Sequence, residues 1–209
     1  MIAPLNTPWL EKGETLVCFG DSLTASKSGY VQMLADALAP KGIRVINAGL
    51  GGDKTPQALT RLMTDVIALK PDAVSLFFGA NDSVIGRGRW RDEPVVEPIT
   101  YRDNLTWMIH LCRLNSDIRK FSIAAPSGRI EGESWNEFGD IRREYCLMAR
   151  QAADLTNAVF VPIDTIMDAV RDVKKPDENG LKLTADGVHP TPEGYRLIAD
   201  TMLKTWLLN

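Results

Sequence analysis

The residues Thr15-Leu16-Val17-Cys18-Phe19-Gly20-Asp21-Ser22 contain the clearest indication of fold in this chain of 209 residues. Residues 15–19 are apolar or β-branched, which predicts a buried strand, and the Gly-Asp-Ser that follows turns the backbone out of the sheet. Open α/β sheets bind ligands at the carboxyl ends of their strands. Ser22 is therefore a candidate nucleophile, provided that other segments supply a base and a site for the oxyanion.

Outward from this strand, short apolar runs alternate with helical patterns along the whole chain, which is typical of βα units around a parallel sheet. We predict strands at 15–19, 44–47, 72–78, 121–125 and 158–162. We predict helices at 30–39, 56–69, 101–114, 135–156, 165–173 and 191–206, and loops at 81–98 and 174–183. This pattern indicates one domain over 1–209, a three-layer, flavodoxin-like α/β/α sandwich around a mainly parallel five-stranded sheet. The spacing does not give the strand order.

For two of these helices, the sequence also predicts how the helix begins or which residues form its apolar face. The helix at 56–69 has Pro56 in its first turn and five apolar residues on one predicted face: Leu59, Leu62, Met63, Val66 and Ile67. In the final helix, Thr191 is the predicted N-cap and Pro192 the first helical residue.

Composition excludes several classes of protein. A formal net charge of -3 leaves no basic excess for nucleic acid, and the longest apolar runs, such as 73–80, are too short to span a membrane. Residues 1–13 have neither the basic nor the apolar region of a secretory signal, so we expect a cytoplasmic protein. The three cysteines are odd in number and lack metal-ligand spacing, which predicts reduced thiols. We expect no cofactor, and no metal, because no second histidine or cysteine lies near Asp186 and His189 in the sequence. Oligomeric state is not predicted, and Trp9 and Trp206 fit either an exposed or a packed position.

Four segments carry the residues suited to chemistry, namely 20–23, 47–53, 79–82 and 186–189. The first three follow predicted strands directly, and the carboxyl ends of parallel strands meet at one edge of a sheet. We therefore expect these three segments to converge.

The fourth segment contains His189, one of only two histidines in the chain. Asp186, three residues earlier, is close enough to orient the imidazole and stabilise its charged form, as the acid does in a hydrolytic triad. The alternative is a helix-capping loop in which both residues are incidental. The other histidine, His110, lies in a helical pattern and is expected at a helix surface or core edge.

An oxyanion needs hydrogen-bond donors aimed at the developing charge. Gly52 lets the backbone approach closely, Asn81 adds a side-chain N–H without charge, and the Ser22 backbone N–H is a third candidate. The alternatives are a plain turn at Gly52 and a plain strand-to-loop corner at Asn81.

Together, Gly-Asp-Ser-Leu at Ser22, Asn-Ala-Gly-Leu-Gly-Gly-Asp at Gly52, Gly-Ala-Asn-Asp at Asn81 and Asp-Gly-Val-His at His189 resemble the four sequence blocks of the SGNH (GDSL-type) hydrolase family. The resemblance implies a flavodoxin-like sandwich and serine ester hydrolysis. It implies that Ser22 is the nucleophile, His189 the base and Asp186 its orienting acid, with Ser22, Gly52 and Asn81 as oxyanion donors. The second block often has serine where this chain has Gly51. The Gly-x-Ser-x-Gly motif of α/β-hydrolases is absent.

The substrate is less constrained by the sequence. No lid-like insertion or amphipathic membrane helix is visible, which favours a small-molecule ester with a short acyl group such as acetyl, and a carbohydrate O-deacetylase is one such enzyme. Segments 77–83 and 101–105 resemble isoamyl-acetate-hydrolysing esterases. Arg89, Trp90 and Trp135 are candidate substrate-binding residues, and the alternative is a solvated loop with packed aromatics. Other readings are a lysophospholipase or thioesterase, acyl transfer to another alcohol, or a non-catalytic binding protein.

Overall fold

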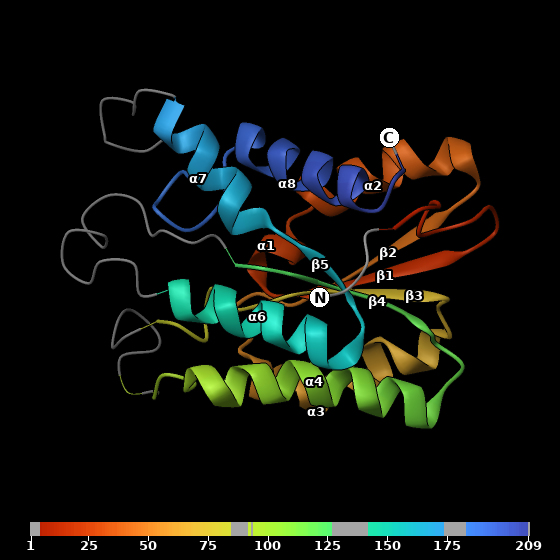
Figure 1. Cartoon of the computed structure of the whole chain (residues 1–209), viewed down its shortest axis with the longest axis horizontal. Helices are drawn as coiled ribbons and strands as arrows, with labels where there is room; N and C mark the ends of the chain where they lie inside the picture. The colour runs from red at the N-terminus through yellow and green to blue at the C-terminus, as the bar shows by residue number, and fades with distance from the viewer. Residues whose placement is uncertain (1–4, 85–91, 93, 127–141, 174–182, 209) are drawn as a thin grey trace.

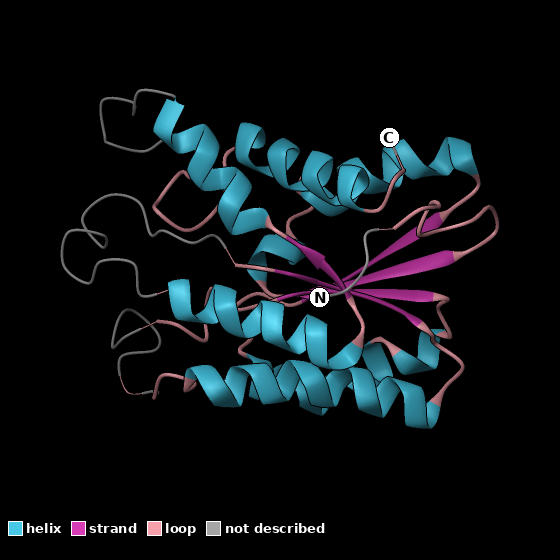
Figure 2. Ribbon diagram, in the orientation of Figure 1, coloured by secondary structure: helices cyan, strands magenta, loops and turns pink. Residues whose placement is uncertain are grey.

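The computed structural model describes residues 5–84, 92, 94–126, 142–173 and 183–208. Five parallel strands form one sheet in the order β2-β1-β3-β4-β5, and helices cover both of its faces (Figures 1 and 2). The strands are β1 (Thr15–Gly20), β2 (Arg44–Gly49), β3 (Ala73–Phe77), β4 (Lys120–Ala124) and β5 (Val159–Val161). The predicted α/β/α sandwich is therefore confirmed, and the strand order is that of flavodoxin-like sheets.

The helices fall into two layers, as Figure 1 shows. One layer contains α1 (Ser22–Ala25), α2 (Tyr30–Leu38), α7 (Ile163–Val173) and α8 (Pro192–Thr205). The other contains α3 (Thr55–Asp65), α4 (Pro98–Asn115) and α6 (Arg143–Thr156). Short 3₁₀ turns, η1 (Ala39–Lys41) and η2 (Ile67–Leu69), follow α2 and α3.

Side-chain alternation along β1 divides the core into two clusters. Leu16 and Cys18 pack with the α2 and α8 layer, and Val17 and Phe19 pack with the α3, α4 and α6 layer. Since successive strand residues point to opposite faces, one apolar run supplies both clusters. All five residues of β3 are buried, as expected for a central strand covered on both faces.

Several local predictions are confirmed. The Thr191 hydroxyl accepts a hydrogen bond from the Gly194 N–H at 3.2 Å and caps α8, which begins at Pro192. Trp9 and Trp206, for which the sequence allows either an exposed or a packed position, are packed, with ring centroids 4.9 Å apart. His110 is exposed on α4. The cysteines are free and buried, and burial raises the pKa of the Cys18 thiol to about 12.

Other boundaries differ from the predictions. The helix predicted at 56–69 ends at Asp65 as α3, and η2 replaces its last turn. Met63 is 51% exposed, because the buried face is centred on Ala58 and Leu62, and each residue turns the helix by about 100°. The helix predicted from 135 is described only from Arg143, since 135–141 lie outside the described residues.

The sequence predicts no membrane-spanning segment, because its apolar runs are too short. Within the described ranges, no helix combines the length and the apolarity that crossing a bilayer requires.

Glycines let α1 approach the strand ends closely. A Cβ on Gly49 would lie 2.2 Å from the Ala25 nitrogen, and one on Gly20 would lie 2.1 Å from Thr24 Oγ1, and both atoms belong to α1. Only a residue without a side chain fits at these contacts, so the glycines of the first two sequence blocks set how near α1 and Ser22 lie to the sheet.

We expect Gly49→Ala to lower the free energy of unfolding by about 1–3 kcal/mol, because the new methyl group must push α1 away from β2. Urea unfolding followed by circular dichroism measures the change. Gly51→Ala is the control, since its Cβ would meet only the Ser22 Cβ, at 3.9 Å, and should change stability by less than about 0.5 kcal/mol. Equal losses in both variants would contradict the close-approach argument.

Candidate active site

The three strand-following segments converge at the carboxyl edge of the sheet, as predicted. In the order β2-β1-β3-β4-β5, the chain leaves β1 for β2 on one side, and β3 lies on the other side of β1. Such a switch point is where an open sheet forms a binding crevice. The segments that follow β1, β2 and β3 carry Ser22, Gly52 and Asn81.

Ser22 is the first residue of α1, a helix of four residues. The buried Asp21 carboxylate caps it by accepting a hydrogen bond from the Leu23 N–H at 3.0 Å. The Asn47 side chain donates to the Thr24 carbonyl at 2.7 Å and accepts from the Gly49 N–H at 2.9 Å. Asn47 thus ties α1 to the end of β2 and holds the serine in place.

The structure brings Ser22, His189 and Asp186 into one chain of hydrogen bonds. Ser22 Oγ lies 3.1 Å from His189 Nε2, and His189 Nδ1 lies 2.7 Å from Asp186 Oδ2. This order of atoms allows the imidazole to take a proton from the hydroxyl while the carboxylate stabilises the resulting cation. The two side chains are about half exposed, at 49% for His189 and 54% for Asp186.

Asp186 is held as an ionised acceptor. Its Oδ1 accepts hydrogen bonds from the backbone N–H groups of Val188 and His189, at 3.0 and 2.7 Å. Partial burial raises the pKa of Asp186, but the hydrogen bonds from His189 and Val188 outweigh it, so the pKa lies below its ordinary value. The carboxylate therefore keeps its charge and can orient the imidazole.

The loop that carries this pair is braced by its own backbone. The Ala185 N–H donates to the His189 carbonyl at 2.8 Å, and the Thr191 N–H donates to the Leu183 carbonyl at 2.9 Å. Gly187 has a φ of 84°, which a residue with a side chain rarely adopts. The positive φ of Gly187 allows a tight turn, which brings the Asp186 carboxylate next to His189 Nδ1.

The loop after β2 passes next to Ser22 and contacts Asn81. Gly51 lies beside Ser22, and Gly52 takes a φ of 84°. Asn81 is 4% exposed, and its amide nitrogen donates to the Asp53 carbonyl at 2.8 Å. A carboxamide has two N–H groups, so one remains for a ligand oxygen. The structure thus places all three candidate oxyanion segments around Ser22.

A buried hydrogen-bond network next to this loop could not be predicted from the sequence. Asp82, which is fully buried, accepts hydrogen bonds from the Thr55 N–H at 2.9 Å and the Thr55 hydroxyl at 2.5 Å. Asn104 donates to the same hydroxyl at 3.0 Å. Burial raises the pKa of Asp82 to about 6 and that of Asp21 to about 7. Both aspartates stand inside the recognised motifs, but only packing shows that they are buried.

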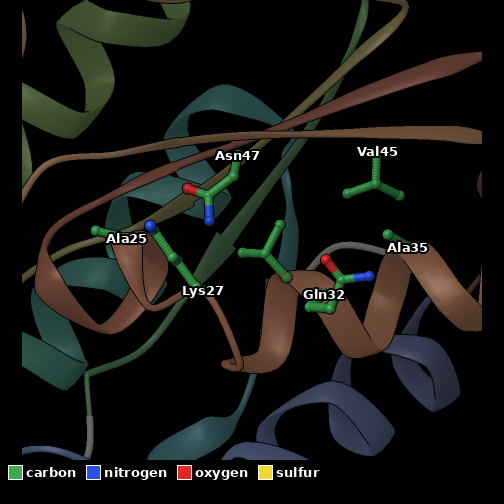
Figure 3. Close-up of a pocket in the computed structure, with 7 residues that line it drawn as sticks. Ala25, Lys27, Gln32, Ala35, Val45 and Asn47 are labelled. Atoms are coloured by element: carbon green, nitrogen blue, oxygen red, sulfur yellow. The ribbon is translucent and has the colours of Figure 1, made fainter.

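A cavity of about 290 Å³ lies between α2 and β2 (Figure 3). Its lining includes Lys27, Gln32 and Asn47, together with Ala25 at the end of α1. It contains none of the predicted catalytic or oxyanion residues, so we do not assign the ester to it.

Three predicted substrate-binding residues, Arg89, Trp90 and Trp135, lie outside the described residues. Among the residues that are described, no group of three or more histidine, cysteine, aspartate or glutamate side chains is arranged to hold a metal ion.

Comparisons with known proteins show a family match over most of the chain. The model of the GDSL-like Lipase/Acylhydrolase family matches residues 18–197. An acetylxylan esterase of Geobacillus stearothermophilus is 30% identical over 92% of this chain and 93% of its own length. An isoamyl acetate-hydrolyzing esterase 1 homolog of Bos taurus is 26% identical, over 88% of this chain and 77% of its own.

The fold of that acetylxylan esterase is also similar. One of its crystal structures superposes with a TM-score of 0.79 at 25% identity, covering 96% of this chain and 97% of the other. Three of its structures are of catalytic mutants, in which a serine, a histidine and an aspartate are each replaced by alanine, and that aspartate precedes the histidine by three positions.

The buried Asp82 predicts a pH dependence of stability. Its pKa is about 6 in the folded protein against an ordinary 3.8, so the folded state binds the proton more tightly than the unfolded chain does. Stability contributed by the protonated carboxyl is then lost as pH rises from about 4 to about 6. We expect wild type to lose up to about 3 kcal/mol more than Asp82→Asn over this window.

Urea unfolding at pH 4 and pH 7 measures this difference. Asp154→Asn, at an exposed position on α6, is the matched control and should keep the wild-type slope. If Asp82→Asn also kept the wild-type slope, the buried carboxyl would not be the group that titrates.

Proposed function

This chain belongs to the GDSL-like lipase/acylhydrolase family and is an esterase of that family, and from this premise we propose that it cleaves acetyl and other short-chain acyl esters through an acyl-enzyme intermediate. We assign Ser22 as nucleophile, His189 as general base and Asp186 as the acid that orients it. The observation that carries the proposal is the hydrogen-bonded series from Ser22 Oγ through His189 to Asp186.

In the proposed mechanism, His189 Nε2 takes the hydroxyl proton as Ser22 Oγ attacks the ester carbonyl carbon. The negative charge that forms on the carbonyl oxygen is held by the N–H groups of Ser22 and Gly52 and by the Asn81 amide. The tetrahedral intermediate collapses, and the alcohol leaves with the proton from His189. Water then attacks the acyl-enzyme with His189 as base and releases the acid, which restores Ser22.

The spacing of the acid and the base supports this assignment. Asp186 precedes His189 by three positions, and the catalytic aspartate and histidine replaced in the acetylxylan esterase have the same spacing. Asp186 uses that short separation to accept two backbone N–H bonds while it holds the imidazole, so one carboxylate fixes both the loop and the base.

The names of two relatives favour acetyl esters. One is an acetylxylan esterase, and another is an isoamyl acetate-hydrolyzing esterase homolog. Acetyl is the acyl group common to both names, whereas the alcohols are a sugar polymer and a branched alkanol. We therefore propose an acetyl group on the acyl side, and an acetylated carbohydrate as the first alcohol to test. Arg89, Trp90 and Trp135 stay proposed contacts for that alcohol.

Ser22→Ala should lower turnover of p-nitrophenyl acetate by at least about 10³-fold, because no other group on the proposed path can form the acyl-enzyme. The release of p-nitrophenol measures the rate, and circular dichroism checks that the fold is unchanged. Ser28→Ala, at an exposed serine, is the control and should retain wild-type activity. Wild-type turnover in purified Ser22→Ala would refute the assignment.

The chain-length preference of wild type tests the acyl group. Across p-nitrophenyl esters from acetyl to palmitoyl, we expect kcat/KM to be highest for acetyl and to fall steadily with length. Release of acetate from acetylated xylooligosaccharides then tests the alcohol. A maximum at eight or more carbons would instead support a lysophospholipase or thioesterase.

A further inference from the structure

Arg61 on α3 makes more contacts at the carboxyl edge of the sheet than its place in a surface helix requires. Its Nε donates to Asp53 Oδ2 at 2.5 Å, and Nη1 donates to the Ala48 carbonyl at 2.9 Å and to Asp65 Oδ2 at 3.0 Å. Its Nη2 donates to the Gly20 carbonyl at 3.0 Å. Four of the five guanidinium N–H groups are thus used, and the side chain is only 13% exposed.

Two of these acceptors are backbone carbonyls at the ends of neighbouring strands. Gly20 ends β1, two residues before Ser22. Ala48 stands one residue before the end of β2, and the loop that carries Gly52 follows β2 directly. The guanidinium also lies over the Phe19 ring, 4.3 Å from its centroid, which fixes the plane of the fork. Arg61 therefore joins the segment of the nucleophile to the segment of Gly52.

Asp53 extends this connection to Asn81. Its carboxylate, with a side chain 9% exposed, accepts from Arg61, and its backbone carbonyl accepts from the Asn81 amide at 2.8 Å. Asp53, which follows Gly52, is thus held by Arg61 through its carboxylate, and it orients the Asn81 amide through its backbone carbonyl. A shift of Asp53 would move Gly52 and Asn81 together.

We propose that Arg61, acting with Asp53, is a positioning residue that sets the relative placement of the three oxyanion donors: the N–H groups of Ser22 and Gly52 and the Asn81 amide. The inference rests on the proposed function, since it needs those donors to bind the oxyanion. Arg61 does not touch the ester. Its effect arises because donors aimed at a developing charge stabilise it only when they are already in place, and an error of about 1 Å can cost 10²-fold in rate.

The geometry requires arginine at this position. A lysine keeps the charge but presents three donors from a single nitrogen, and it cannot span two strand ends and a carboxylate in one plane. Arg61→Lys should therefore lower kcat by about 10–100-fold and leave KM within about threefold, because the interactions lost are made in the transition state.

Arg113 provides a matched control for loss of an arginine. It is also partly buried, donates to a backbone carbonyl (Thr156, at 2.7 Å) and lies over a strand phenylalanine (Phe121, 5.1 Å from the ring centroid). It stands near the end of α4, next to the start of β4 and so at the opposite edge of the sheet from Ser22. Arg113→Lys should change the melting temperature about as much as Arg61→Lys does and leave kcat unchanged.

The decisive measurement is a double-mutant cycle with Asn81→Ala, using p-nitrophenyl acetate as substrate. Asn81→Ala alone should cost about 10²–10³-fold in kcat. If Arg61 acts through the oxyanion donors, the loss in kcat from Arg61→Lys should be several-fold smaller in the Asn81→Ala background than in wild type, because one of the three donors it places is already gone. Full multiplication of the two losses, or an unchanged kcat in Arg61→Lys, would overturn the inference.

If Arg61→Lys folds poorly, Asp53→Asn is a second variant that tests the same inference. It preserves the backbone carbonyl that binds Asn81 but weakens the partner of Arg61, and it should show the same fall in kcat and the same non-additivity. The two proposals fail separately. Wild-type activity in Ser22→Ala and Asn81→Ala would refute the proposed function, whereas large losses there with multiplicative or absent effects at Arg61 and Asp53 would refute only this inference.

Discussion

The close approach of α1 to the ends of β1 and β2 is the constraint on which the rest of the site depends. Gly20 and Gly49 remove the two side chains that would stand between helix and strands, and Asn47 then joins α1 to β2 through its amide. Because α1 has only four residues, it has little stability of its own and takes its position from these contacts. The site is therefore built on the rigid sheet edge.

Different interactions hold the two halves of the candidate site, namely the donors around Ser22 and the loop with His189 and Asp186. The donors around Ser22 lie against buried polar groups, where Asp82 holds Thr55 and Arg61 holds Asp53. His189 and Asp186 are half exposed and depend on a loop whose backbone is bonded to itself. Burial makes the first half precise, since polar groups in a low dielectric allow few alternative arrangements. Exposure keeps the second half in contact with water, which the last step of ester hydrolysis consumes.

Buried carboxyls are the cost of this arrangement. The desolvation that raises the pKa of Asp21 and Asp82 makes their ionised forms unfavourable, even though both accept hydrogen bonds from the backbone. Asp21 caps α1 next to Ser22, and Asp82 fixes the residue that begins α3. Each is retained at a position where it sets the geometry of a segment that carries the chemistry. Such a trade of stability for placement is typical of functional sites.

From local patterns alone we could predict the sheet, its approximate strands and the four segments of the candidate site. Apolar period and turn residues are local properties, so β1, β3 and the capped start of α8 could be predicted from them. Local patterns could not show that the helix from 56 breaks at Val66 or that Met63 faces outward, because packing against α4 and the sheet decides both. The strand order, the burial of Asp82 and the contacts of Arg61 become visible only in the folded chain. These depend on contacts between residues far apart in the chain, such as Arg61 and Gly20, and no periodicity in the sequence records them.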